Sequence, residues 1–184
     1  NAGVSTFVPK AHTPFQWVAC DQMDSIAEKL ALLKNSLRDP GIKLTWSDPD
    51  VTRFEAWLAR GDRRLSAVIY RAWQNGTKFD AWQDHFDINA WLQAFKAEGL
   101  DPDFYSHRQR DLNEVLPWDH IHSGVRKSYL QQDYAWSQEL RFRDDCREQC
   151  FACGILPGFN EMRADLPDDA WKCPPVKRKM RVSA

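Results

Sequence analysis

Three cysteines lie within eight residues and form the pattern C-x3-C-x2-C, at Cys146, Cys150 and Cys153. This spacing lets one loop wrap around a single inorganic centre, and thiolates suit both iron–sulfur clusters and zinc. Three thiolates would bind three irons of a 4Fe-4S cluster and leave one iron open to substrate or to another ligand. Tetrahedral zinc would need a fourth protein ligand. The spacing therefore predicts a metal centre, with an iron–sulfur cluster favoured over zinc.

Cys173, followed by Pro174, is the candidate for a fourth ligand, either of zinc or of a four-cysteine cluster. The five cysteines are an odd number, and the first residues carry no secretory-type signal. Metal ligation or redox chemistry is therefore expected in place of a disulfide framework. Cys20 is remote in sequence and is expected to be an ordinary buried thiol.

Three histidines lie near carboxylates and could also do chemistry. His85 stands between Asp84 and Phe86-Asp87, and His120 and His122 alternate directly after Asp119. Such residues can ligate a metal or transfer protons. They can equally cap helices and bind loop backbone, and this structural interpretation is favoured.

The elements that must position these residues begin with a β/α pattern. A β-branched and aromatic run over 4–8, stopped by Pro9, predicts a short buried strand. An apolar stripe with helical spacing predicts a helix over 22–38, and alternation over 42–46 predicts a second strand. Because a helix separates the two strands, parallel pairing is expected.

The following segment is predicted to be mostly helical. Three helices each begin with an aspartate and end with a glycine, namely Asp48 to Gly61, Asp62 to Gly76 and Asp87 to Gly99. Their expected buried faces are Val51, Phe54 and Leu58, then Leu65, Val68, Ile69, Ala72 and Trp73, then Ile88, Trp91, Leu92 and Phe95. Residues 100–124 are expected to be irregular, and a fourth helix is predicted over 125–140. The cysteine segment over 144–158 follows, with tight loops.

Composition narrows the possible functions. Hydrophobic residues make up 43% and charged residues 28%, and nine tryptophans predict a core rich in aromatic side chains. The net charge of −1 gives no overall attraction to nucleic acid or to an anionic membrane, and no apolar run approaches the roughly 20 residues that span a bilayer. A cytoplasmic protein is expected. The basic tail over 177–181 is expected to be a solvated linker, with a nucleic-acid patch as the alternative.

Several segments together resemble a family of radical S-adenosylmethionine enzymes that carries an N-terminal cobalamin-binding domain. They are STFVPKAHTPFQW (5–17), RGDRRL (60–65), FDAW with HFD (79–82 and 85–87), LPWDHI (116–121) and CREQCFACG (146–154). Members of this family often show a further cysteine shortly after the Cys-Gly pair, where this chain has Leu156. This difference raises the importance of Cys173 as a ligand.

The resemblance implies that the chain is an internal piece of a longer enzyme. Residues 1–46 would be an α/β remnant, the last strands and helix of a radical S-adenosylmethionine β/α barrel. A mainly α-helical extension over 47–143, a cysteine-rich metal loop over 144–174 and a linker or the start of a following domain over 175–184 would come next. S-adenosylmethionine and cobalamin would be bound by other parts of the full-length protein.

The predicted cluster is auxiliary. The C-x3-C-x2-C spacing is also typical of the cluster that cleaves S-adenosylmethionine, but only 31 residues follow Cys153 (184 − 153), too few for the barrel that would follow a catalytic cluster. The chain alone is therefore not expected to be catalytic, and its main partner would be the rest of its own polypeptide. RNA or the translation machinery is a weaker candidate substrate or partner. The alternative function is a non-catalytic, zinc-stapled module that docks a protein or RNA.

Overall fold

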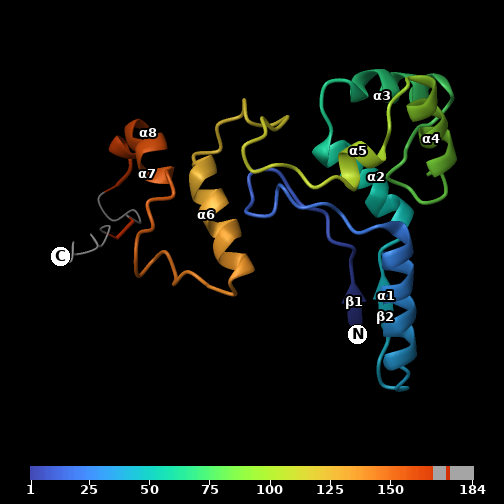
Figure 1. Ribbon diagram of the computed structural model, residues 1–184, viewed down its shortest axis with the longest axis horizontal. Helices are drawn as coiled ribbons and strands as arrows, with labels where there is room; N and C mark the ends of the chain where they lie inside the picture. The colour runs from blue at the N-terminus through green and yellow to red at the C-terminus, as the bar shows by residue number, and fades with distance from the viewer. Residues whose placement is uncertain (168–172, 175–184) are drawn as a thin grey trace. The chain divides into compact units, whose positions relative to one another are not determined.

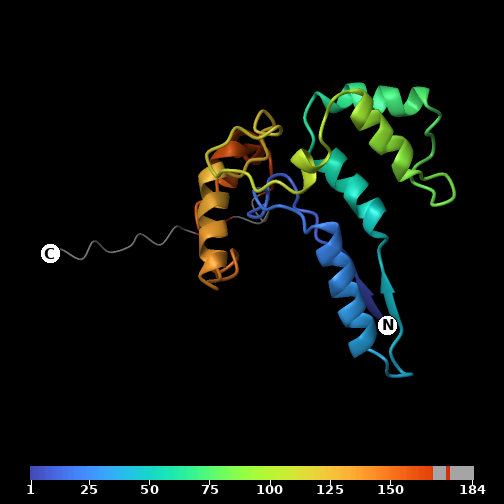
Figure 2. The same cartoon turned by 45° about the vertical axis from the view of Figure 1, so that its right-hand side comes forward.

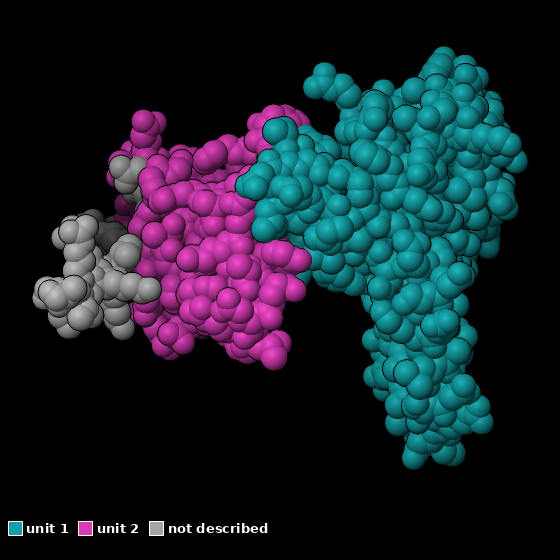
Figure 3. Space-filling model, viewed as in Figure 1, with its two compact units in different colours: residues 1–11, 15–117 teal, residues 12–14, 118–184 magenta. Residues whose placement is uncertain are grey.

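A computed structural model describes residues 1–167 and 173–174. The described chain is mainly helical, with a two-stranded parallel sheet near its N-terminal end. Residues 1–11 and 15–117 form a first compact unit, and residues 12–14 and 118–184 belong to a second one (Figure 3). The expected boundaries after residues 46 and 143 refer to segments of a longer protein and stay predictions.

The first unit begins with a strand–helix–strand arrangement. Strand β1 (Ala2–Val4) pairs in parallel with β2 (Leu44–Trp46), with Ala2 opposite Leu44. Helix α1 (Met23–Ser36) connects them and runs alongside both strands (Figures 1 and 2). The predicted helix over 22–38 and the parallel pairing are confirmed. Two parallel strands need such a crossover connection, because a tight hairpin turn can join only antiparallel strands.

The predicted buried strand over 4–8 is wrong in its extent and its burial. Strand β1 ends at Val4, its residues are half-buried or exposed, and the Phe7 side chain is 56% exposed. The last links to the second strand are a backbone bond from Ser47 N–H to Val4 O (3.0 Å) and a bond from the Ser47 hydroxyl to that of Ser5 (3.3 Å). Within residues 1–167 and 173–174, no third strand pairs with β1.

Two of the three aspartate-started helices begin as the sequence predicts. In α2 (Pro49–Arg60), the Asp48 carboxylate accepts a hydrogen bond from Asp50 N–H at 2.8 Å. In α4 (Ile88–Ala97), the Asp87 carboxylate accepts from Asn89 N–H at 2.9 Å. Each carboxylate satisfies a backbone donor that the first helical turn leaves without a partner.

The remaining helices of the first unit differ from prediction in detail. Helix α3 (Leu65–Gln74) begins after a turn in which the Asp62 carboxylate accepts from Arg64 N–H at 2.9 Å, so Asp62 organises the preceding turn instead of capping the helix. A short helix, α5 (Asp103–Ser106), lies in the segment that the sequence predicts to be irregular. Glycine closes the helices at Gly76 and Gly99, which have φ of 98° and 65°, as the sequence predicts.

A core rich in aromatic side chains holds α2 to α5 together. Helix α3 packs against α4, and α2 contacts α4 and α5. The ring of Trp57, which is fully buried, lies 4.9 Å from that of Phe95. The core residues are Trp57, Leu65, Val68, Ala72, Trp91, Ala94, Phe95 and Tyr105.

The predicted buried faces are wrong at four positions. Val51 and Leu58 on α2, and Ile69 and Trp73 on α3, are 37–55% exposed. Helix α2 instead buries Thr52, Ala56, Trp57 and Arg60. Because the face of α2 centred on Trp57 packs on α4 and α5, the stripe through Val51 and Leu58 is turned away from the core.

The second unit contains α6 (Lys127–Gln138), α7 (Ile155–Gly158) and α8 (Asn160–Ala164). Helix α6 confirms the helix predicted over 125–140. Among the described residues of this unit, the buried hydrophobic side chains are Trp118, Leu130 and Cys150. The described part of the second unit therefore has a much smaller apolar core than the first unit.

The helices are short. The longest described helix, α1, has 14 residues, whereas a helix that crosses a bilayer needs about 20 mainly apolar residues. In the described ranges, no helix combines the length and the apolar character needed to span a membrane.

Candidate functional site

The three clustered cysteines lie in the loop between α6 and α7. Cys146 is exposed, Cys153 is half-buried, and Cys150 is buried with 8% of its surface exposed. All five cysteines of the chain fall within the described residues, and they form no disulfide with one another. Their sulfurs are therefore able to ligate a metal once the thiols lose their protons.

A tight turn holds Cys146. The Asp145 carboxylate accepts a hydrogen bond from Arg147 N–H at 2.8 Å, and the Asp145 carbonyl accepts from Glu148 N–H at 2.9 Å. The Arg147 guanidinium also binds the Asp145 carboxylate at 2.6 Å and lowers the pKa of that group to about 2. The Cys146 thiol lies close enough for its negative form to raise the pKa of Arg147, although less than Asp145 does.

A second turn joins Cys150 to Cys153. Ala152 lies in the left-handed region with φ of 54°, which is uncommon for a residue other than glycine. This conformation lets Ala152 N–H donate to the Cys150 sulfur at 3.5 Å. Hydrogen bonds from backbone amides to cysteine sulfur are one of the means by which proteins stabilise and tune thiolate-bound clusters.

Two glycines hold this turn against the start of α6. Arg126 N–H donates to the Cys153 carbonyl at 2.9 Å. A Cβ atom on Gly154, whose φ is 117°, would lie 2.8 Å from the Gly124 carbonyl oxygen, and one on Gly124 would lie 2.4 Å from the Phe159 ring. Only glycine permits so close an approach of the two backbones.

A cation–aromatic cluster ties the cysteine segment to α6. The Arg143 guanidinium lies 4.5 Å from the centre of the Tyr129 ring, 4.1 Å from that of Trp136 and 5.2 Å from that of Phe151. The same guanidinium binds the Asp133 carboxylate. Because Tyr129 and Trp136 are on α6 and Phe151 follows Cys150, this one side chain joins the helix to the cysteine turn.

Tyr129 lies close to two of the three cysteines. Burial raises the pKa of its hydroxyl, and the neighbouring Arg143 opposes this effect. Asp133, Cys153 and Cys146, in their negative forms, raise the pKa further. The electrostatic effects of Cys153 and Cys146 on one hydroxyl place both near the same end of α6.

The structure does not bring these cysteines into a ready metal cage. Among residues 1–167 and 173–174, no three His, Cys, Asp or Glu side chains are grouped so that they could hold a metal ion. Cys173 is half-buried, and in the sequence it is flanked by segments that lie outside the described residues. Its role as a ligand, and the metal centre itself, stay predictions, as does the role of the tail over 175–184, which lies outside the described residues.

The chemistry of the donors nevertheless fits a thiolate-bound metal. The segment offers three thiols on two short turns, and one sulfur already accepts a backbone hydrogen bond. Cys146 is exposed on a loop, and Cys153 is half-buried.

The histidines do not join this group. His85 is exposed, and its ring lies 6.1 Å from that of Phe79 in the first unit. His120 and His122 are exposed in the second unit, and a Cβ on Gly158 would lie 3.3 Å from the His122 ring. Cys20 is buried, and burial raises the pKa of its thiol, which fits the predicted inert buried thiol.

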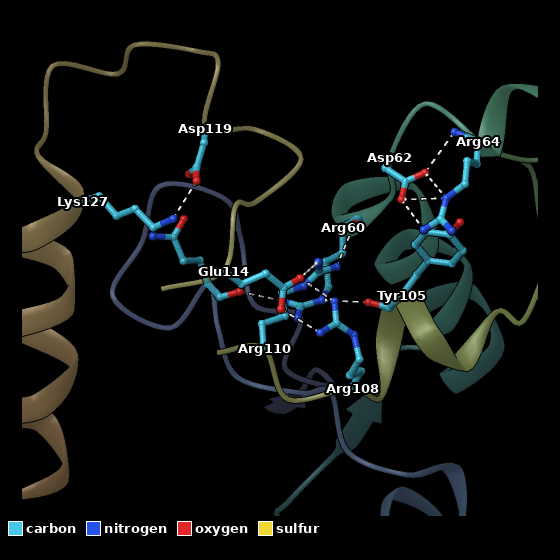
Figure 4. A network of polar contacts seen from close by, with 10 residues as sticks. Arg60, Asp62, Arg64, Tyr105, Arg108, Arg110, Glu114, Asp119 and Lys127 are labelled. Atoms are coloured by element: carbon cyan, nitrogen blue, oxygen red, sulfur yellow. Dashed lines mark hydrogen bonds and ion pairs between the residues drawn. The ribbon is translucent and has the colours of Figure 1, made fainter. Parts of the chain in front are cut away.

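Sequence reasoning missed a pair of buried arginines in the first unit (Figure 4). Arg60 is fully buried and donates to the carbonyls of Tyr105 (3.1 Å), Pro9 (3.2 Å) and Gln16 (3.4 Å). Arg110 is 3% exposed and donates to the Arg60 carbonyl at 2.8 Å. The signal in the sequence is weak, because an arginine in the last turn of a helix is ordinarily exposed.

The pKa of Arg110 is lowered to about 10, chiefly by burial and then by Arg60 and Arg108, with Glu114 opposing the shift. Arg108 binds Glu114 through two bonds of 2.7 Å. Arg110 therefore stays charged at neutral pH. The network binds carbonyl oxygens of three separate segments, which suits a structural clamp better than acid–base chemistry.

Comparisons of the chain with family models, curated proteins and solved structures find no match. The candidate site is therefore defined by its own residues: the two cysteine turns, the glycine contact at the start of α6 and the Arg143 cluster.

Proposed function

We propose that this chain is part of a cytoplasmic radical S-adenosylmethionine enzyme and that its second unit binds an auxiliary iron–sulfur cluster, of the 4Fe-4S type. The observation that carries the proposal is the anchored turn from Cys150 to Cys153. Its buried sulfur accepts a backbone hydrogen bond, and Gly124 and Gly154 hold the turn on α6. These specific contacts fix the position of the turn, as expected for a turn that holds a ligand.

The small core of the second unit supports this proposal. Its described residues bury three hydrophobic side chains, Trp118, Leu130 and Cys150. Units with so little buried apolar surface commonly depend on a metal or another cross-link for stability. A bound cluster would supply that stability, because metal binding energy adds to folding energy.

The arrangement of β1, α1 and β2 supports the barrel part of the proposal. A parallel pair joined by a helix is the repeating unit of a β/α barrel. The unpaired edge of β1 would pair with strands in the rest of the polypeptide. S-adenosylmethionine and cobalamin would bind to those other parts and not to this chain.

Each residue of the site would have a defined part. Cys146, Cys150 and Cys153 would ligate the cluster, with Cys173 as the candidate fourth ligand. A bound cluster would accept and donate electrons, or bind a substrate atom at an iron without a cysteine ligand. Ala152 N–H donates to the Cys150 sulfur, and the Arg147 guanidinium binds the Asp145 carboxylate in the turn that holds Cys146.

Metal analysis of the 184-residue chain, reconstituted without oxygen, tests the proposal. We expect about four irons and four sulfides per chain and an absorption band near ~400 nm. Cys150→Ala should lose most of both, whereas the control Cys20→Ala, a buried thiol in the first unit, should keep them. Stoichiometric zinc without colour would replace the enzyme proposal with the zinc-stapled docking module. Chains without any metal would contradict both.

A further inference from the structure

A groove of about 280 Å³ lies beside the cysteine turn, within the second unit. Its walls come from the first turns of α6 and from the two residues between Cys150 and Cys153. The lining residues are Arg126, Ser128, Tyr129, Gln132, Phe151 and Ala152. The groove thus shares the segment that would carry the cluster.

The polar side chains of this groove are all able to donate hydrogen bonds. The Gln132 amide oxygen accepts from Arg143 at 3.1 Å, so the amide NH2 group remains to donate elsewhere. The Tyr129 hydroxyl adds another donor. Ser128 adds a hydroxyl, and Arg126 adds a charged guanidinium.

The charges of the groove favour an anion. None of its six lining residues is an aspartate or a glutamate. The nearest carboxylate on α6, Asp133, is bound by the Arg143 guanidinium and is therefore neutralised. An arginine surrounded by neutral donors is the arrangement that recognises phosphate or carboxylate groups.

We propose that this groove binds a phosphate or carboxylate group of the substrate, with Arg126, Ser128 and Gln132 as donors and the Phe151 ring as an apolar wall. The identity of the ligand as the substrate rests on the proposed function. Because Ala152 lies both in the groove and in the cysteine turn, an anion held there would place the rest of the molecule beside the cluster.

Calorimetric titration of the 184-residue chain with pyrophosphate and, separately, with citrate at low salt tests this proposal. We expect one site, and Arg126→Gln should weaken binding about tenfold, the usual scale for losing a charge-assisted hydrogen bond. Ser128→Ala should weaken it less. The control is Arg141→Gln, because Arg141 is an exposed arginine of the same unit that does not line the groove. Equal affinity in all four proteins, or no binding, would overturn the proposal.

Comparing the two anions shows whether the groove prefers a phosphate or a carboxylate group. Tighter binding of pyrophosphate indicates a phosphate-bearing substrate, and tighter binding of citrate indicates a carboxylate. The iron content of Arg126→Gln separates this proposal from the cluster, since its backbone bond to Cys153 is kept. In the unmodified chain, iron without anion binding would contradict the groove alone, and anion binding without iron would contradict the cluster alone.

Discussion

The two units of this chain are stabilised in different ways. The first unit packs α2 to α5 around Trp57 and Phe95, with eight buried residues in one core. The described part of the second unit is stabilised by the backbone hydrogen bond from Arg126 to Cys153 and by Arg143 among three aromatic rings. Burial of apolar surface is the dominant stabilising force in folding, and it serves the first unit far more than the second.

This difference suggests separate roles for the two units, with the first as a stable scaffold and the second as the unit that carries the candidate site. A unit with its own core keeps its shape without help, whereas a unit with little core depends on specific local contacts and on what it binds. The candidate cysteine site lies in the second kind of unit. We therefore expect mutations in the first unit to change stability through packing, and those in the second to act through backbone geometry and ligand binding.

The largest effect is expected at Trp57. Its side chain is fully buried, so Trp57→Ala should lower the free energy of unfolding of the first unit by about 3–5 kcal/mol. Trp73→Ala is the control, because Trp73 is 55% exposed on α3, and its cost should stay below about 1 kcal/mol. Amide hydrogen exchange in α2 to α4 measures both. Equal costs would mean that the core is not where the structure places it.

A smaller effect is expected at the glycine contact of the second unit. Gly154→Ala adds a methyl group 2.8 Å from the Gly124 carbonyl oxygen, at a φ of 117°. The strained φ alone costs roughly 1–3 kcal/mol, and the contact adds to it. Gly76→Ala is the matched control, since Gly76 has φ of 98° and open space around it.

The rate at which a thiol reagent labels Cys150 should rise in Gly154→Ala, because the anchored turn would open. Amide exchange at the end of α3 reports the cost of Gly76→Ala. The comparison of the two units would be weakened if both substitutions cost the same, since the close backbone contact would then contribute nothing.

Helix capping in the first unit should have a more modest effect. Asp87→Ala removes the acceptor for Asn89 N–H and should cost about 1 kcal/mol. Asp84→Ala changes an exposed aspartate of the preceding loop and should cost little. Urea unfolding followed by circular dichroism compares the two variants, and a larger loss for Asp84→Ala would contradict the assigned cap.

The smallest effect is expected from the turn at Cys146. Arg147 lowers the pKa of Asp145 from 3.8 to about 2. A carboxyl group whose folded pKa is depressed stabilises the fold above its ordinary pKa, and this contribution is lost as the pH falls through 3.8 toward 2. Both side chains are largely exposed, so solvent and salt screen the effect.

Carboxyl NMR titration measures this pKa directly. Arg147→Gln should move the midpoint of Asp145 back toward 3.8, whereas Arg141→Gln should not, because Arg141 pairs with Glu139. An unchanged midpoint in Arg147→Gln would show that the ion pair does not hold the turn in solution.

Local signals predicted the helices well. Asp48 and Asp87 were recognisable as caps, because a carboxylate before a helix satisfies its first backbone donors, and Gly76 and Gly99 were recognisable as stops. The apolar stripe over 22–38 predicts a helix from local spacing alone, without knowledge of what the helix packs against. The four residues of α5 gave no such signal, because one turn is too short to show a period.

Features that depend on distant partners could not be predicted. The buried face of α2 includes Arg60, a charged residue whose partners lie at Pro9, Gln16 and Tyr105. A hydrophobic pattern cannot identify a buried charged residue. It therefore predicts burial of Val51 and Leu58, which are exposed in the structure.

For the candidate site, the sequence supplied the cysteines but not their surroundings. The approach of Gly154 to Gly124 and the stacking of Arg143 on Tyr129 and Phe151 join residues 8–30 positions apart in the chain. The spacing of the cysteines does not predict such contacts. Whether Cys146, Cys150, Cys153 and Cys173 share one metal stays a prediction, because it depends on the ligand as well as on the chain.

The pairing of β1 with β2 has a consequence for the order of folding. Ala2 and Leu44 are partners across 42 positions of the chain (44 − 2), whereas α3 and α4 are neighbours in sequence. Distant contacts must close a longer loop and therefore form later than local ones. In pulse-labelled refolding, amides of α3 and α4 should become protected before Thr45 in β2, so the strand–helix–strand segment would form after the α3–α4 pair. Simultaneous protection would contradict this order.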